Sequence, residues 1–207
     1  MKHCLKLNNP PKKLIKLLTK LYQRKYKNYS FDIVMSKYHY SVDLTLDEIN
    51  QIAGCIPSYC DTISWNCITD AGPPNPTHID RGRKAALQIP IMADPNIHKV
   101  FVIKDENMFD KLTPHQIEDT GFRQKLDTIW KNQRYKDMPM FHKYDEKYFD
   151  VMSVDPYIPY ITSTDVPHGG IHNKGVRTSN SPRYFFSCSL PDRVDFKETV
   201  ERFKTWN

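Results

Sequence analysis

The sequence predicts one mainly β domain with flanking helices, and three observations carry this prediction. A chain of 207 residues is long enough to bury one complete core. Its apolar residues occur in short runs or alternate with polar residues, which is the pattern of β-strands. Its 15 prolines outnumber its 7 glycines, which indicates many short elements joined by stiff connections.

Five segments have the strand pattern. In the first of them, Ile63, Trp65 and Cys67 alternate with other residues, so one face of the strand is apolar. Most of the others are nearly continuous apolar runs, as expected of buried strands. The predicted strands are residues 59–69, 85–91, 100–103, 157–161 and 183–190.

Helices are expected at three places in the body of the chain. Thr45 and Glu48 have the spacing of a capping box, so a helix should start there and end near Gly54. A second helix is expected around residues 114–130, inside a polar and aromatic stretch. Residues 195–206 suit a short terminal helix.

The basic charge of the chain is concentrated at its start. Residues 1–29 hold nine Lys or Arg and no Asp or Glu, whereas the remainder has 21 basic and 24 acidic residues. After Pro11 the leucines recur at helical spacing and the lysines take the other side, which predicts an amphipathic helix. This helix either packs its leucines on the core or binds an anionic partner such as nucleic acid. We therefore divide the chain into this basic segment and one domain over residues 30–207.

The sequence predicts a soluble protein. No apolar run approaches the roughly 20 residues that cross a bilayer, and the N-terminus lacks an apolar core followed by a cleavage site. The five cysteines lack CxxC pairs, which argues against a disulfide framework and a structural zinc site. We expect a cytoplasmic protein, in the host cytoplasm if the composition rich in Lys, Asn, Ile and Tyr reflects a virus.

Two histidines and a carboxylate are candidate metal ligands. His78 and Asp80 lie two residues apart just before a predicted strand, so in extended backbone both point to one face. A third ligand must come from elsewhere, and either His168 or His172 can supply it. Two histidines and one carboxylate form the donor set that holds ferrous iron with open positions for chemistry.

Arg183 is the candidate for binding an anion. It opens a strand that is almost wholly apolar, where an inward-facing guanidinium is costly unless it meets a negative charge. Its planar fork suits a carboxylate. The alternative is an arginine at the strand end that reaches solvent.

These motifs resemble a known family. Residues 76–91, which include His78-Ile79-Asp80, resemble the iron-binding strand region of the Fe(II)/2-oxoglutarate-dependent dioxygenases, in the branch of aspartyl/asparaginyl β-hydroxylase-like and amino-acid hydroxylases. Residues 165–190 resemble the distal part of that superfamily, where a histidine precedes an arginine-led strand. The resemblance implies a double-stranded β-helix (a jelly-roll or cupin-like barrel) over about residues 55–190, with a lid or insertion over about 105–150.

The resemblance also implies roles for individual residues. His78, Asp80 and His168 would bind Fe(II), and Arg183 would bind the distal carboxylate of 2-oxoglutarate, with no catalytic residue beyond the metal ligands. The phrase Pro-His-Gly favours His168 as the distal ligand, whereas the shorter loop to Arg183 favours His172. The implied oxidoreductase consumes O2 and 2-oxoglutarate, releases succinate and CO2, and hydroxylates its substrate.

The substrate expected from this branch is an amino-acid or peptidyl side chain. A nucleic-acid base oxidase of the same superfamily is the alternative within the class, and the basic N-terminal segment motivates it. A non-catalytic jelly-roll protein that binds a partner or associates with virions is the alternative from another class. A zinc hydrolase with the same three ligands would leave Arg183 without a function.

Overall fold

The fold was analysed in a computed structural model. Some residues, among them His78, His172 and Arg183, are described by their backbone alone. All structural statements below concern the described residues, which are 2–25, 45–57, 65–70, 75–78, 83–105, 140–141, 149–172, 183–190 and 193–207.

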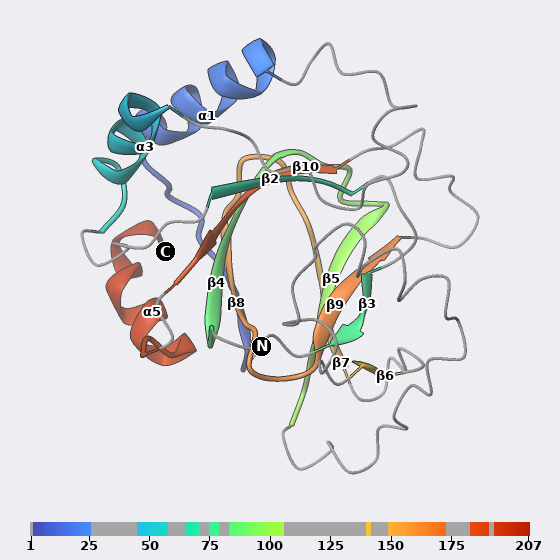
Figure 1. Cartoon of the computed structure of the whole chain (residues 1–207). Coiled ribbons are helices and arrows are strands. Elements are labelled where there is room, and N and C mark those ends of the chain that lie inside the picture. The colour runs from blue at the N-terminus through green and yellow to red at the C-terminus, as the bar shows by residue number, and fades with distance from the viewer. Residues whose placement is uncertain are drawn as a thin grey trace.

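The described residues form two antiparallel sheets of five strands each, with a few helices (Figure 1). The chain is thus mainly β, as predicted. Sheet A has the order β1 (Cys4–Lys6), β8 (Tyr160–Ser163), β4 (Ala85–Met92), β10 (Arg183–Ser189) and β2 (Trp65–Asp70). Sheet B has the order β6 (Met140–Phe141), β3 (Asn75–His78), β9 (His168–His172), β5 (His98–Ile103) and β7 (Phe149–Ser153).

Eight of these strands are paired in a nested way. From the outermost pair inward, β2 pairs with β10, β3 with β9, β4 with β8, and β5 with β7. The pairs therefore form one long antiparallel ribbon, and successive pairs fall alternately in sheet A and sheet B. Further pairings of β10 with β4 and of β5 with β9 complete the two sheets.

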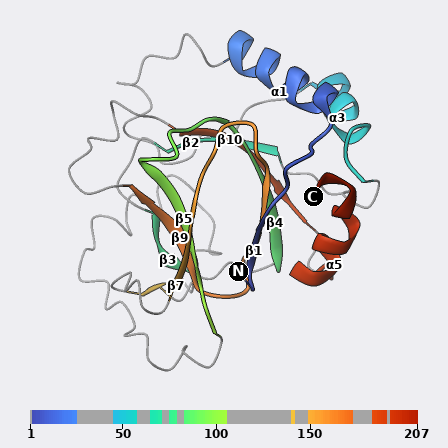
Figure 2. The same cartoon turned by 180° about the vertical axis from the view of Figure 1, so that it is seen from behind.

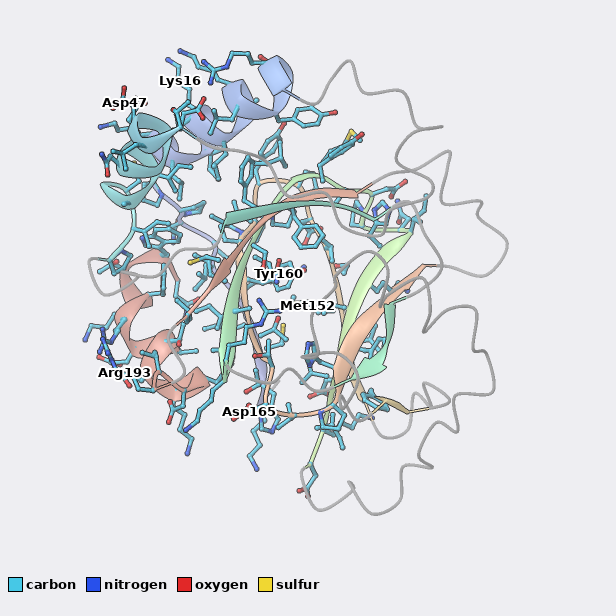
Figure 3. The ribbon with its side chains drawn as sticks, in the orientation of Figure 1. Lys16, Asp47, Met152, Tyr160, Asp165 and Arg193 are labelled. Atoms are coloured by element: carbon cyan, nitrogen blue, oxygen red, sulfur yellow. The ribbon has the colours of Figure 1, made fainter. Side chains whose placement is uncertain are left out.

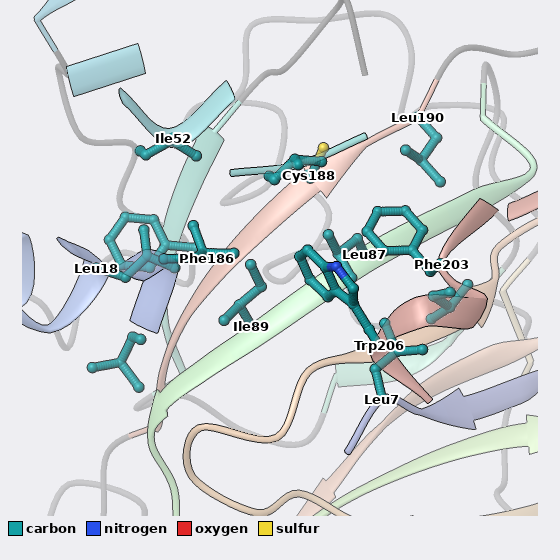
Figure 4. Packing of buried hydrophobic residues seen from close by; sticks show 14 of the residues in the cluster. Leu7, Leu18, Ile52, Leu87, Ile89, Phe186, Cys188, Leu190, Phe203 and Trp206 are labelled. Carbon is teal, nitrogen blue, oxygen red and sulfur yellow. The ribbon is translucent and has the colours of Figure 1, made fainter. Parts of the chain in front are cut away.

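The helices cover one face of sheet A, here called its outer face, and sheet B lies on the other side (Figures 1 and 2). Leu18 of α1 (Lys12–Lys25) and Ile52 of α3 (Leu46–Ala53) join Phe186 of β10 in one buried apolar cluster (Figure 4). The C-terminal helix α5 (Phe196–Arg202) and the 3-10 turn η4 (Lys204–Trp206) add Phe203 and Trp206 to the same cluster.

Local signals in the sequence explain the first helices. In α3 the Thr45 side chain caps the Glu48 amide and the Glu48 carboxylate accepts from the Thr45 amide, which confirms the predicted capping box. Gly54 caps the other end, also as predicted. In α1, Leu14, Leu18 and Leu21 are buried and the described lysines are exposed, so the packing interpretation of this helix is confirmed.

Most other predicted elements within the described residues are present, with one boundary error. Strand β8 begins at Tyr160, so the prediction of a strand from residue 157 was wrong at its start. Tyr157 has a φ of 65°, which breaks extended backbone, and its amide donates to the Pro90 carbonyl at 2.8 Å. The predicted helix at 114–130, most of the insertion and the boundary at residue 29 lie outside the described residues.

Within the described part of the chain, every helix is too short or too polar to cross a membrane.

Candidate functional site

The nested pairing brings together two of the predicted metal ligands. On the paired strands β3 and β9, His78 and His168 are direct register partners, although they are far apart in the sequence. Residues directly opposite on antiparallel strands have Cβ atoms about 4.5–5.5 Å apart and share one face of the sheet. Two imidazoles at such positions can bind one metal ion.

His168 has a fixed ring and a defined tautomer. Its side chain is buried, and its Nδ1 lies 2.9 Å from the Val166 carbonyl oxygen. A carbonyl only accepts, so Nδ1 donates and Nε2 holds the lone pair of the neutral ring. A hydrogen bond from one ring nitrogen to a backbone carbonyl is the usual way in which a metal-binding histidine is oriented.

The alternative ligand, His172, lies in a different part of strand β9. Its register partner is His98 of β5, and it is four residues beyond His168. At about 3.3 Å per residue, this spacing separates the two positions by roughly 13 Å. His98 is buried, and its Nδ1 accepts a hydrogen bond from the Asp94 amide at 2.9 Å. Sheet B therefore has two pairs of histidines, and His78 is opposite His168.

The other predicted site residues are only partly described. Asp80 lies outside the described residues. Arg183 begins β10, where its register partner is Asp70 of β2. Among the side chains that the structure describes, no three His, Cys, Asp or Glu residues are close enough to hold a metal ion. The predicted set of His78, Asp80 and His168 includes two side chains outside that description, so it stays a prediction.

Contacts between the sheets show which faces look at each other. From β1, Cys4 Sγ lies 3.7 Å from Met152 Sδ, and Lys6 Nζ donates to Ser153 Oγ at 3.1 Å. Both partners belong to β7 of sheet B. Figure 3 shows Met152 and Tyr160 between the two sheets. The inner face of sheet A therefore contains Cys4, Lys6 and the residues in register with them.

On sheet B, the inner face contains the described histidine of the site. Met152 is in register with Val100 of β5, and Val100 is in register with Gly170 of β9. Since residues two apart on a strand share a face, His168 lies on the same face as Gly170. His168 thus belongs to the face that looks toward sheet A.

A row of polar residues crosses the inner face of sheet A. It runs in register through four strands, from Lys6 to Tyr160, Gln88 and Ser187. Tyr160 and Ser187 are buried, and Gln88 Nε2 donates to Ser187 Oγ at 3.0 Å. A row of polar side chains on the inner face is suited to contact with a polar molecule between the sheets.

Sequence reasoning did not single out Gln88, Tyr160 or His98, and it left Ser187 without a role. A usable signal was present for Gln88, because it is the one residue with a polar side chain in the strand Ala85–Met92. For the others, only the strand pairing shows which face they occupy. Their function could not be predicted before the register was known.

Cys4 lies on the same inner face but in a dry environment. Burial raises the pKa of its thiol from 9.0 to about 12, against a smaller lowering by the hydrogen bond with Thr162. A thiol with this pKa stays protonated at neutral pH and is a poor nucleophile or metal ligand. Cys4 is therefore a packing residue.

No protein-family model and no curated protein sequence matches this chain.

Proposed function

We propose that this protein is an Fe(II)- and 2-oxoglutarate-dependent oxygenase that hydroxylates an amino-acid or peptidyl side chain. The observation that carries the proposal is the register pairing of His78 with His168 on strands β3 and β9. His78 was selected from the sequence for its spacing from Asp80, and His168 was preferred to His172 for the Pro-His-Gly sequence around it. Their pairing supports a common role as metal ligands.

The strand order supports a double-stranded β-helix for this enzyme. A jelly roll has eight strands in two sheets, and a long ribbon whose successive pairs alternate between two sheets is compatible with it. Strand β1 adds to the edge of sheet A and β6 to the edge of sheet B. The active site of this proposed fold would lie between the sheets, where His168 and the polar row face each other.

The residues of the chain fit the proposed iron. His78 and His168 would bind it together with Asp80, and the Val166 carbonyl would hold the His168 ring in the tautomer that a metal requires. When bound, Fe(II) would supply the oxygen activation that couples conversion of 2-oxoglutarate to succinate and CO2 with substrate hydroxylation. Arg183 would bind the distal carboxylate of 2-oxoglutarate.

Anaerobic titration with Fe(II) and 2-oxoglutarate tests this function. The wild type should develop a visible metal-to-ligand charge-transfer band, and His168→Ala should lose both the band and tight iron binding. His172→Ala is the matched variant, since it removes the same side chain four residues along the same strand. It should keep the band. A wild type that binds iron but gives no band with 2-oxoglutarate would falsify the proposal.

A nucleic-acid base oxidase of the same superfamily is the second candidate, and the exposed face of α1 favours it. Lys12, Lys16 and Lys20 are exposed at intervals of four residues, and the helix carries no acidic residue in its first turn. Successive lysines are thus about 6 Å apart along the helix, a suitable spacing for a phosphate backbone. Replacing the three lysines with Gln should abolish salt-sensitive binding to RNA or DNA. This candidate is excluded if the wild type does not bind RNA or DNA, or if the variant binds as well as the wild type.

A further inference from the structure

Gln88 is in a strand that otherwise presents apolar side chains. On β4, Leu87 and Ile89 belong to the buried cluster under the helices, and Gln88 lies between them on the inner face. Its register partners are Tyr160 on one side and Ser187 on the other. It is therefore central in the polar row.

The side-chain amide of Gln88 is only half satisfied. Its Nε2 donates to Ser187 Oγ, whereas its Oε1 is buried and accepts no hydrogen bond from any residue that the structure describes. A buried acceptor without a donor costs about 1–3 kcal/mol. The hydrogen bond to Ser187 accounts for the amide nitrogen, whereas no contact among the described residues accounts for the oxygen.

We propose that Gln88 binds the amino-acid substrate, by accepting a hydrogen bond at Oε1 from a donor group of that substrate. The donor would be an amide, a hydroxyl or an ammonium group. Ser187 is a positioning residue, because its hydroxyl holds the amide nitrogen and leaves the oxygen for the ligand. This inference rests on the proposed function, since the molecule bound at Gln88 would be the one that is hydroxylated.

Hydrogen-bond chemistry decides which molecule can bind Gln88 Oε1, the substrate or the co-substrate. At neutral pH 2-oxoglutarate has oxygen acceptors and no hydrogen-bond donor, so it cannot satisfy a carbonyl-type oxygen. Amino acids and peptides have donors. Gln88 faces the sheet that contains His168, so a molecule held by Oε1 lies between the proposed metal ligands and the centre of sheet A.

Substrate-stimulated turnover tests this inference. The assay measures succinate formed from 2-oxoglutarate by the iron-loaded full chain, with each standard amino acid offered singly, free and as its N-acetyl amide. The variants are Gln88→Leu, which removes the acceptor, and Gln88→Glu, which keeps acceptors at the same place. Gln23→Leu makes the same chemical change on the exposed face of α1 and is the control.

We expect at least one probe to stimulate the wild type and Gln23→Leu. In Gln88→Leu the KM for that probe should rise about tenfold or more, while binding of 2-oxoglutarate stays unchanged. Gln88→Glu should retain stimulation.

Three outcomes would overturn the inference. The first is equal stimulation of Gln88→Leu and the wild type. The second is failure of Gln88→Leu to fold while Gln88→Glu folds, which would show that the amide supports the sheet. The third is binding of iron and 2-oxoglutarate without stimulation by any probe. In all three the proposed oxygenase still stands, whereas a wild type without 2-oxoglutarate binding removes both.

Discussion

The two faces of sheet A differ in composition and in what covers them. On the outer face, Leu87 and Phe186 pack under helices in an apolar cluster (Figure 4). On the inner face, their immediate neighbours Gln88 and Ser187 form a partly buried hydrogen bond and face sheet B. Adjacent residues on the same strand thus differ in kind: one packs in the apolar cluster, and the next is polar and forms a hydrogen bond. The outer face holds the apolar cluster, and the inner face carries the polar row.

This division depends on the register of the strands. Side chains alternate between faces with a period of two, so a slip of one residue would exchange the two sets completely. The hydrophobic cluster on the outer face fixes the register of β4 and β10, and the polar row on the inner face follows from it. Apolar packing on the outer face therefore determines which polar side chains lie on the inner face.

The strongest test of the comparison uses the neighbours Phe186 and Ser187. Phe186→Ala should lower the free energy of unfolding by about 3–5 kcal/mol, because it leaves a cavity in the apolar cluster. Ser187→Ala should lower it by about 1 kcal/mol, the value of one hydrogen bond. Urea denaturation of both variants measures the difference. Equal losses would contradict the assignment of stability to the outer face.

The next test concerns the dry edge of the inner face, at Cys4. Because burial raises the pKa of this thiol to about 12, the folded protein keeps the proton above pH 9, where the unfolded chain loses it. Stability from this group is complete below pH 9 and falls as the pH rises toward 12, by up to about 1.4 kcal/mol per pH unit.

The matched variant for this test is Cys4→Ala, which lacks the titrating group. Its free energy of unfolding should fall less steeply than that of the wild type over the same alkaline range. Parallel pH profiles of the two proteins would show that Cys4 is accessible to water. The contact between Cys4 and Met152 would then not exclude water from this part of the inner face.

The smallest effect is expected at the helices that cover the outer face. Thr45→Ala removes the side-chain cap of α3 and should cost about 1 kcal/mol in thermal or urea unfolding. Thr19→Ala is the control, since the Thr19 hydroxyl donates to the Ile15 carbonyl inside α1 and caps nothing. If both variants lose the same stability, the cap is not what holds α3 over the sheet.

Local signals in the sequence predicted much of the fold. The capping box of α3, the amphipathic pattern of α1 and the apolar strands β4, β5 and β10 were predicted because they depend on neighbours in sequence. The start of β8 was misplaced, because Tyr157 adopts a positive φ that no residue pattern indicated. Turn geometry at such a residue is set by tertiary contacts, here with the Pro90 carbonyl.

The candidate site was predictable only in part. The types of residue at His78 and His168 suggested metal binding, but their distance in the sequence could not show that they meet. His98 attracted no attention, because a single histidine beside an apolar strand has no distinctive pattern. The sequence favoured His168 over His172 through its Pro-His-Gly context, and the register shows that His168 is the one opposite His78.

The sequence by itself determined the class of the fold, the amphipathic first helix, the ends of α3 and the residue types that a metal site would use. These properties follow from short-range periodicity and from the chemistry of single side chains. The tertiary structure alone decided that His78 and His168 are partners, and that Gln88 and Ser187 lie on the inner face of sheet A. The physical reason is that nested pairing places opposite each other residues that are equally far along the ribbon from its innermost pair, β5 and β7. The alternation of side chains along each strand then decides which face each residue occupies.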